Sequence, residues 1–215
     1  MHHSSHPQRP ATSGSVIHWA AAYELLFERI SRASDARIIA LAGIRPGDTV
    51  LDVGCGPGSL TRAAGRAAEP GGAAHGIDPA PEMIARAQRN AQRSSTTHFQ
   101  VGVIERLPFP DHTFDIVLSR LMFHHLPGDL KRQGLGEIRR VLKPGGMCIT
   151  VDIALRPGGL ISQALAHTVA AGMARVNVAE YAPIYVAAGF DDIHTGPTGA
   201  RLLAYVSGRA PAAQR

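Results

Sequence analysis

A run of glycines directly after a short apolar segment constrains this fold more than any other feature of the sequence. The segment, Thr49–Val53, is rich in β-branched residues, glycines follow at positions 54, 56 and 58, and a helix-forming stretch begins at Ser59. Buried parallel strands have this composition, and a turn without Cβ atoms lets the backbone approach a ligand closely. We therefore expect a strand–turn–helix unit that binds a ligand beside the free N–H groups of the helix N-terminus.

The rest of the chain alternates between strand-like apolar runs and helical stretches, which predicts a doubly wound, mostly parallel α/β sheet. The last two strands are separated only by residues 196–199. A parallel crossover needs about a dozen residues, so the last strand is predicted to be antiparallel. The predicted strands are 49–53, 73–77, 98–103, 114–119, 147–153, 191–195 and 201–206, and the predicted helices are 18–32, 35–42, 59–68, 81–93, 128–141, 160–176 and 179–188.

Composition and charge exclude several classes of protein. The chain has 215 residues, 45% of them apolar, and a net charge of +5, so it is not disordered as a whole. It has no uninterrupted apolar run of the roughly 18 residues that a membrane span needs. Residues 1–14 lack the apolar core of a signal peptide, and Cys55 and Cys148 have no metal-ligand spacing. We expect a cytoplasmic protein without a metal site, and the scattered positive charges predict no nucleic-acid partner.

The spacing of the glycines distinguishes between two kinds of cofactor. The dinucleotide pattern GxGxxG requires glycine where this chain has Ser59. Asp52, two residues before the first glycine, disfavours a pyrophosphate and suits a cationic head group. Asp78 ends the second predicted strand about 20 residues after the loop, where an acid accepts hydrogen bonds from ribose hydroxyls. The inferred ligand therefore carries a ribose and a cationic end, and no pyrophosphate.

Four segments together resemble the class I S-adenosylmethionine (SAM)-dependent methyltransferases, in particular the small-molecule branch that includes the ubiquinone/menaquinone-biosynthesis C-methyltransferases. In order, the segments are VLDVGCGPGSLT (50–61), GIDPAPEMIARAQ (76–88), LPFPDHTFDIVLSRLMFHHL (107–126) and EIRRVLKPGGMCIT (137–150). The resemblance implies a seven-stranded, doubly wound, Rossmann-like methyltransferase sheet with an antiparallel last strand and helical cap segments.

The resemblance also implies which residues bind SAM. Asp78 would bind the ribose hydroxyls, and Val103 stands where the family usually has an Asp that accepts from the adenine amino group. We therefore expect weaker SAM binding than in a family member with that Asp. The implied cofactor-binding residues are Asp52, Gly54, Gly56, Gly58, Asp78, Pro79, Met83, Val103, Ile104, Ser119 and Arg120.

Methyl transfer is an in-line displacement, so alignment of the reactants supplies much of the catalysis. An acceptor with a hydroxyl or an acidic carbon also needs a base, for which His124 and His125 are the candidates. The alternative is that this pair supports the structure or the cofactor. Tyr23, Tyr181 and Tyr185 are candidates for the acceptor pocket, with packing as the alternative for each.

The inferred domain organisation is a disordered tail (1–14), an N-terminal helical cap (15–45) and a methyltransferase domain (46–215), in which 154–185 form a substrate-cap insertion. The apolar content of this insertion favours a small, rather apolar acceptor. Enzymes that methylate the exocyclic amines of nucleobases usually have Asn/Asp-Pro-Pro-Tyr/Phe where this chain has Ser119–Arg120–Leu121–Met122. Cytosine C5 methylation needs a Pro-Cys nucleophile, and the chain has no Pro-Cys pair. Nucleic-acid methylation is therefore disfavoured.

The predicted activity is therefore methyl transfer from SAM to an O, C or N atom of a small, rather apolar molecule. One alternative is a non-catalytic regulatory protein that binds SAM or S-adenosylhomocysteine. A second is a nicotinamide-dependent oxidoreductase, which the later motifs do not fit. The sequence predicts neither the acceptor nor the oligomeric state.

Overall fold

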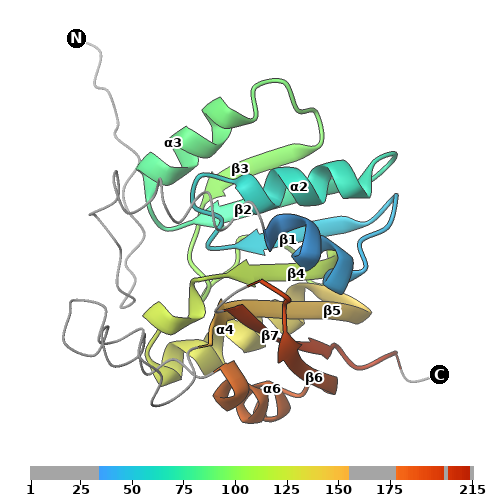
Figure 1. The fold of residues 1–215 in the computed structure, drawn as a ribbon, viewed down its shortest axis with the longest axis vertical. Helices are drawn as coiled ribbons and strands as arrows, with labels where there is room; N and C mark the ends of the chain where they lie inside the picture. Colours follow the sequence, from blue (N-terminus) through green and yellow to red (C-terminus); the bar gives the residue numbers. More distant parts are fainter. Residues whose placement is uncertain (1–33, 155–177, 201–202, 214–215) are drawn as a thin grey trace.

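The described part of the protein is a single sheet with helices on both faces (Figure 1). The structure is a computed structural model that describes residues 34–154, 178–200 and 203–213. The predicted helices 18–32 and 160–176 and the candidate Tyr23 lie outside the described residues. Within the described ranges, no helix has the length and apolar character needed to cross a membrane.

The sheet has seven strands in the order β3-β2-β1-β4-β5-β7-β6. Neighbouring strands from β3 to β5 are parallel, whereas β7 is antiparallel to both β5 and β6. This confirms the doubly wound, mostly parallel sheet and the antiparallel last strand. The strands are β1 (Thr49–Val53), β2 (Ala73–Asp78), β3 (Thr97–Val101), β4 (Phe114–Arg120), β5 (Leu142–Ile153), β6 (Asp191–Pro197) and β7 (Leu203–Arg209).

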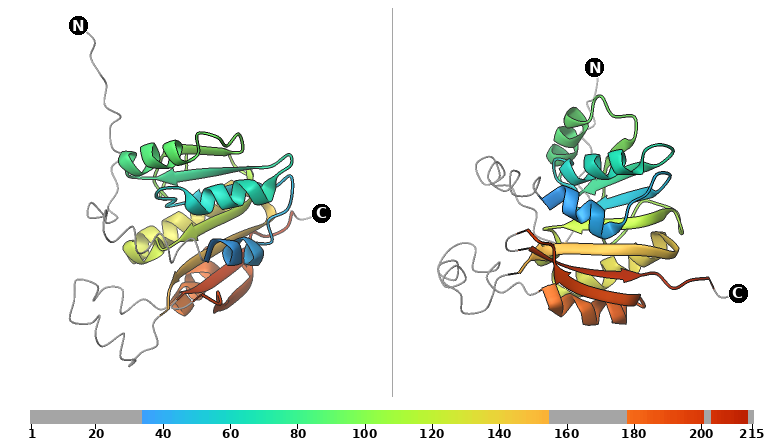
Figure 2. Two further views of the ribbon diagram at one scale, coloured as in Figure 1. Left: turned by 45° about the horizontal axis from the view of Figure 1, so that its top comes forward. Right: turned by 45° about the vertical axis from the view of Figure 1, so that its right-hand side comes forward.

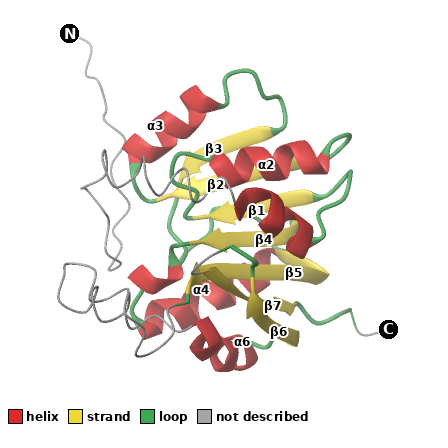
Figure 3. Cartoon of the chain, in the orientation of Figure 1, coloured by secondary structure: helices red, strands yellow, loops and turns green. Residues whose placement is uncertain are grey.

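Two apolar cores lie on opposite faces of the sheet, because successive strand side chains point to opposite sides. Val50 packs on one face with Leu60, and Leu51 packs on the other face with Leu135. A helix of residues 34–42 and α2 (Ser59–Ala68) cover the first face, and α4 (Gly128–Val141) and α6 (Ala182–Ala187) cover the second (Figures 2 and 3). The remaining helical elements are α3 (Pro81–Asn90), η1 (Phe123–His125) and η3 (Val178–Tyr181).

The structure corrects the predicted start of β5. The strand was predicted to begin at Met147, after Lys-Pro-Gly-Gly (143–146), but β5 begins at Leu142. Leu142 pairs with Phe114, and the register then shifts before Ile116 pairs with Met147. An irregularity of this kind bends a strand without ending it. The helix predicted at 179–188 is likewise divided into η3 and α6.

The strand order favours a ligand site beyond the carboxyl ends of the parallel strands. From β1 the chain proceeds outward to β2 and β3, and it then returns to β4 on the other side of β1. At such a switch point the loops after the two central strands diverge and leave a crevice beyond their carboxyl ends. The residues that follow β1 and β4 are therefore the candidates for binding and catalysis.

Candidate active site

The glycine turn lies between β1 and α2, at the switch point. Gly54, Gly56 and Gly58 have φ angles of +76°, +51° and +79°, a region that L side chains rarely adopt. The N–H groups of Gly54 and Cys55 both donate to the carbonyl of Ile77, each at 2.9 Å. These two bonds fasten the turn to β2.

The three glycines are needed for different reasons. A Cβ on Gly54 would lie 2.5 Å from Cγ of Met122, and one on Gly58 would lie 2.7 Å from the Phe99 ring. A Cβ on Gly56 would meet nothing within 4 Å. Gly54 and Gly58 therefore allow close packing within the protein, whereas Gly56 borders open space that a ligand can enter.

The segment after β4 reaches the glycine turn through a backbone bend. Leu121 has a φ of +56°, which is uncommon for a non-glycine residue. Its N–H donates to the carbonyl of Val151 at 2.9 Å, so the bend is held by β5. The bend places Met122 against Gly54, immediately before η1.

Asp78 lies at the end of β2 and faces the same turn. One carboxylate oxygen accepts the N–H of Gly56 at 3.0 Å, and the other accepts the N–H of Ala80 at 2.9 Å. A carboxylate offers about four acceptor positions, so each oxygen retains capacity for one more donor. Burial raises the pKa of this carboxyl, and the two N–H bonds oppose the rise. The arrangement suits two neighbouring hydroxyl groups, as in a ribose.

Asp52 lies deeper, in β1, with a side chain that is 1% exposed. Its carboxylate accepts the hydroxyl of Thr61 at 2.6 Å. Burial raises the pKa of Asp52 to about 6, opposed by the Thr61 hydrogen bond and by the charge of Arg120. The carboxylate can therefore act on a ligand through its negative field from below the turn.

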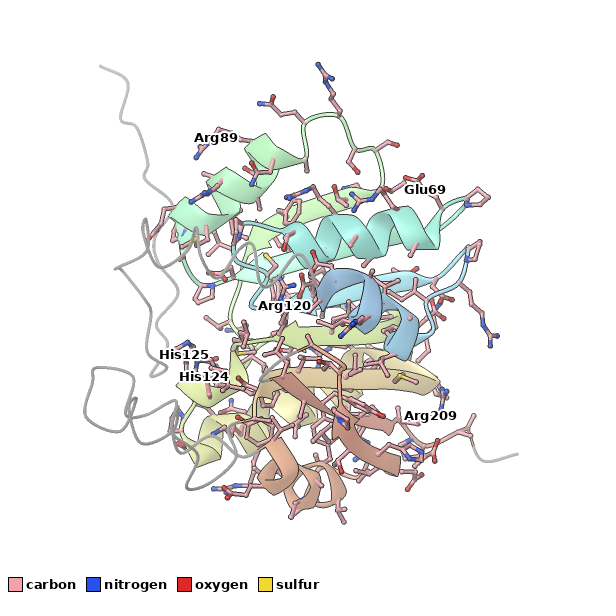
Figure 4. The ribbon with its side chains drawn as sticks, in the orientation of Figure 1. Glu69, Arg89, Arg120, His124, His125 and Arg209 are labelled. Atoms are coloured by element: carbon pink, nitrogen blue, oxygen red, sulfur yellow. The ribbon has the colours of Figure 1, made fainter. Side chains whose placement is uncertain are left out.

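Arg120 ends β4 and connects three parts of the site (Figure 4). Its guanidinium forms an ion pair with Asp35 of the helix 34–42, and it donates to the Ser59 hydroxyl at 2.9 Å. The neighbouring Ser119 is 1% exposed and donates to the carbonyl of Val53 at 3.0 Å. Ser119 thus joins β4 to β1, and Arg120 carries a positive charge to the start of α2.

The remaining predicted cofactor residues lie around the ends of β2 and β3. Pro79, Met83 and Val103 are half-buried. Ile104 is 5% exposed and packs in the core beside Gly134 of α4. Val103 rather than Ile104 therefore offers a side chain at the surface beyond β3.

A second cluster lies after β4 and centres on Asp152, near the end of β5. Asp152 is 0% exposed, and one of its oxygens is 2.7 Å from Nδ1 of His124. The other oxygen accepts the backbone N–H of His124 at 3.0 Å and the hydroxyl of Tyr181 at 3.2 Å. The ring of His125 lies against that of His124, with centroids 3.8 Å apart and the ring planes tilted by 46° (Figure 4).

The structure separates the two tyrosines of the predicted pocket. Tyr185 is 0% exposed, and its hydroxyl lies 2.6 Å from the Thr150 hydroxyl and 3.1 Å from the sulfur of Cys148. Its environment is the packed core, the packing alternative given for it above. Tyr181 is 5% exposed and contacts the His124 cluster through Asp152.

Sequence reasoning missed Asp152 and Asp35 as parts of the site. Asp152 is the one carboxylate of β5 and lies near the carboxyl end of that strand, and that position was the available signal. Asp35 contacts Arg120 across 85 positions of the chain, so no local pattern could indicate the pair.

These features define a class of protein. The sheet order, the antiparallel β7, the open glycine turn and the acid ending β2 form a Rossmann-like domain for a nucleoside cofactor. The residues fit SAM, which has a ribose for Asp78, a cationic end near Asp52 and no pyrophosphate to be repelled by these acids.

Comparisons with known proteins identify the domain further. Residues 51–150 match the family described as a methyltransferase domain. The ubiquinone/menaquinone biosynthesis C-methyltransferase UbiE of Burkholderia mallei is 34% identical over 145 residues, 65% of this chain and 59% of that protein. A probable methyltransferase, ltbC, of Aspergillus luteorubrus is 36% identical over 134 residues, 58% of this chain and 47% of that protein. The crystal structure of a SAM-dependent methyltransferase from Aquifex aeolicus has the same fold, with a TM-score of 0.67 at 21% identity, covering 85% of this chain and 97% of that chain.

Residues 51–150 therefore match a methyltransferase domain, the chain resembles the ubiquinone/menaquinone C-methyltransferases in sequence, and SAM is the cofactor that this likeness supports. The resemblance expected from the sequence is confirmed. The chain spans 59% and 47% of the lengths of these two curated relatives.

Proposed function

We propose that this protein transfers a methyl group from SAM to an O, C or N atom of a small, rather apolar molecule. The observation that carries the proposal is the pairing of Asp78 with Gly56. The carboxylate is fixed by two backbone N–H groups and retains acceptor capacity, and the glycine beside it borders open space. A ribose-bearing cofactor fits both features.

The likeness to a C-methyltransferase of quinone biosynthesis supports an apolar acceptor. The residues of this chain would bind and orient SAM at the ends of β1 and β2, while the acceptor would approach from the segment after β4. Alignment of two bound reactants can supply up to about 7–11 kcal/mol of the barrier.

The test is methyl transfer from SAM labelled in its methyl group to a whole-cell extract, which is afterwards separated into protein, nucleic-acid and organic-soluble low-molecular-weight fractions. We expect label in a small organic-soluble product together with an equal amount of S-adenosylhomocysteine. Label recovered only in protein or nucleic acid would contradict the acceptor class.

A non-catalytic protein that binds SAM is the second candidate, and Val103 favours it, because a valine side chain cannot accept a hydrogen bond from the adenine amino group. Saturable SAM binding without any labelled product in the same assay would support this second candidate.

A further inference from the structure

Asp152 is a buried carboxylate whose acceptor positions are filled by the protein. Besides His124 and Tyr181, the N–H of Ile153 donates to it at 2.9 Å. Together, Nδ1 and the backbone N–H of His124, the N–H of Ile153 and the Tyr181 hydroxyl surround a side chain that is 0% exposed. Four such partners match the acceptor capacity of an ionised carboxylate.

The pairing fixes the state of the His124 ring. A carboxylate can only accept, so Nδ1 of neutral His124 must carry the proton, and the lone pair lies on Nε2. Among the described residues, Nε2 has no hydrogen-bond partner. An orienting acid that holds a histidine in the tautomer of a base is the arrangement that catalytic dyads and triads use.

His125 differs from His124 in its lowered pKa and in its lack of an orienting carboxylate among the described residues, although the two rings are in contact. Burial, and then the neighbouring His124, lower the pKa of His125 to about 4. In the described part of the chain, its ring makes no hydrogen bond to a carboxylate that would orient it. A base works best with a pKa near the operating pH, so His125 is the weaker candidate.

The backbone connects this cluster to the cofactor turn. Met122, which packs on Gly54, accepts the N–H of His125 at 3.0 Å and precedes η1. His124 therefore lies within two residues of the segment that borders the glycine turn.

Resting on the proposed function, we propose that His124 is the general base for methyl transfer, that Asp152 is its positioning residue, and that the acceptor therefore carries a removable proton on a phenol-like or enol-like oxygen or on an acidic carbon. SAM supplies the methyl group on a positively charged sulfur. The acceptor atom forms the bond to the methyl carbon, and the sulfur–methyl bond breaks with its electron pair passing to sulfur. The acceptor proton moves to Nε2 of His124 and from there to solvent.

The charged and titratable groups around His124 determine which substitution isolates the effect of Asp152. They are the His125 ring from η1, Asp152 from β5 and Tyr181 from η3, with Nζ of Lys131 from α4 lying 5.3 Å from the centre of the Tyr181 ring. Asp152 is the one negative charge that contacts His124 among the described residues, and substitution at this position isolates its effect.

The first measurement is the tautomer of His124, read from long-range ¹H–¹⁵N NMR correlations of the full chain saturated with S-adenosylhomocysteine. We expect neutral His124 to carry its proton on Nδ1. In Asp152→Asn, whose amide both donates and accepts, the Nδ1–H population should fall. A wild-type ring protonated on Nε2 would overturn the proposal whatever the protein's activity.

The second measurement compares two acceptors, 2-naphthol and an aryl thiol that is largely ionised at neutral pH. His124→Asn keeps an N–H near Asp152 and removes Nε2. It should slow transfer to 2-naphthol by about 10²- to 10⁴-fold and leave transfer to the thiolate and the KM for SAM near wild type. Asp152→Asn should act in the same direction, through kcat. The matched control is His194→Asn, since His194 and Asp192 form an exposed pair on the edge strand β6.

The outcomes distinguish a failure of the proposal that His124 is the base from a failure of the proposed methyltransferase activity. Transfer to 2-naphthol that His124→Asn does not slow would overturn the base while leaving the methyltransferase in place. Transfer to the thiol alone would overturn the acceptor class. No transfer to either acceptor by wild-type protein that binds SAM would contradict the proposed function, and the base proposal with it.

Discussion

Asp52, Asp78 and Asp152 each stand at or next to the last residue of a parallel strand, and their surroundings give them different properties. Thr61 satisfies one oxygen of Asp52 in the core. Two backbone N–H groups hold Asp78 at the edge, with acceptor capacity remaining. Asp152 accepts four donors and orients His124. Aspartate is thus suited to three different tasks: acting on a ligand through its negative charge from within the core, accepting hydrogen bonds from hydroxyl groups, and orienting an imidazole ring.

Asp52→Asn should stabilise the protein at neutral pH. The folded pKa of about 6 lies above the ordinary aspartate pKa of 3.8, so between about pH 4 and pH 6 the folded protein holds a proton that the unfolded chain has released. Stability therefore falls as the pH rises through this window, and asparagine removes the loss while still accepting from Thr61. We expect the free energy of unfolding to rise by up to about 3 kcal/mol at pH 7, measured by urea denaturation without SAM. A gain of equal size at pH 4 would contradict this explanation.

Val103→Asp should strengthen SAM binding. The change restores an acceptor for the adenine amino group beyond β3, at a half-buried position. A hydrogen bond to a charged group is worth about 1.5–3 kcal/mol, so calorimetry should show a Kd lower by roughly tenfold or more. Binding as weak as in the wild type would mean that the adenine does not lie beside this residue.

At the scale of elements, alanine substitutions at two glycines distinguish the cost of a positive φ angle from the loss of ligand contact. Gly56 and Gly43 both have positive φ angles, +51° and +63°, and a Cβ on either would meet nothing within 4 Å. Alanine at either position should cost about 1–2 kcal/mol of stability. Only Gly56→Ala should also weaken SAM binding, because only Gly56 borders Asp78. Equal SAM affinities for the two variants would contradict the placement of the cofactor.

The helix 34–42 is held to the sheet by a buried ion pair. The side chains of Asp35 and Arg120 are each 11% exposed, whereas in the pair of Asp111 and Arg140 they are 63% and 31% exposed. Burial raises the pKa of Asp35 more than Arg120 lowers it, so the expected loss in Asp35→Asn comes from the Arg120 charge, whose burial Asp35 offsets. Asp35→Asn should reduce the free energy of unfolding by about 1–3 kcal/mol, and it should speed amide hydrogen exchange in the helix. Asp111→Asn, the matched control, should change stability by less than about 1 kcal/mol. Similar losses in the two variants would show that burial does not strengthen the pair.

Local patterns predicted elements well where one run of sequence fixes both ends. The sequence predicts β1, α2 and α4 with the bounds that the structure shows, because glycine, serine and proline mark their ends. The prediction for β5 was wrong at its start, because Leu142 is extended through its pairing with Phe114, a contact outside the local sequence.

At the scale of the whole molecule, the mostly parallel sheet with its antiparallel last strand and the strand–turn–helix unit at the glycines could be predicted, since both follow from motifs that occur in order along the chain. The acid–base cluster could be predicted only in part. His124 and His125 were visible as a pair, but the choice between them depends on Asp152, which lies 28 positions away and meets His124 only in the folded sheet. Contacts between strand ends are a product of topology, so residue spacing does not report them.

Calorimetric titration of the full chain with SAM and with S-adenosylhomocysteine, repeated for Asp78→Ala, tests whether the cofactor binds beside the glycine turn. We expect saturable binding of about one molecule per chain for both compounds and a loss of roughly tenfold or more in affinity when Asp78 is replaced, with Asp111→Asn unchanged. Binding of neither compound, or binding that Asp78→Ala leaves intact, would contradict the assignment of this edge of the sheet as the SAM site.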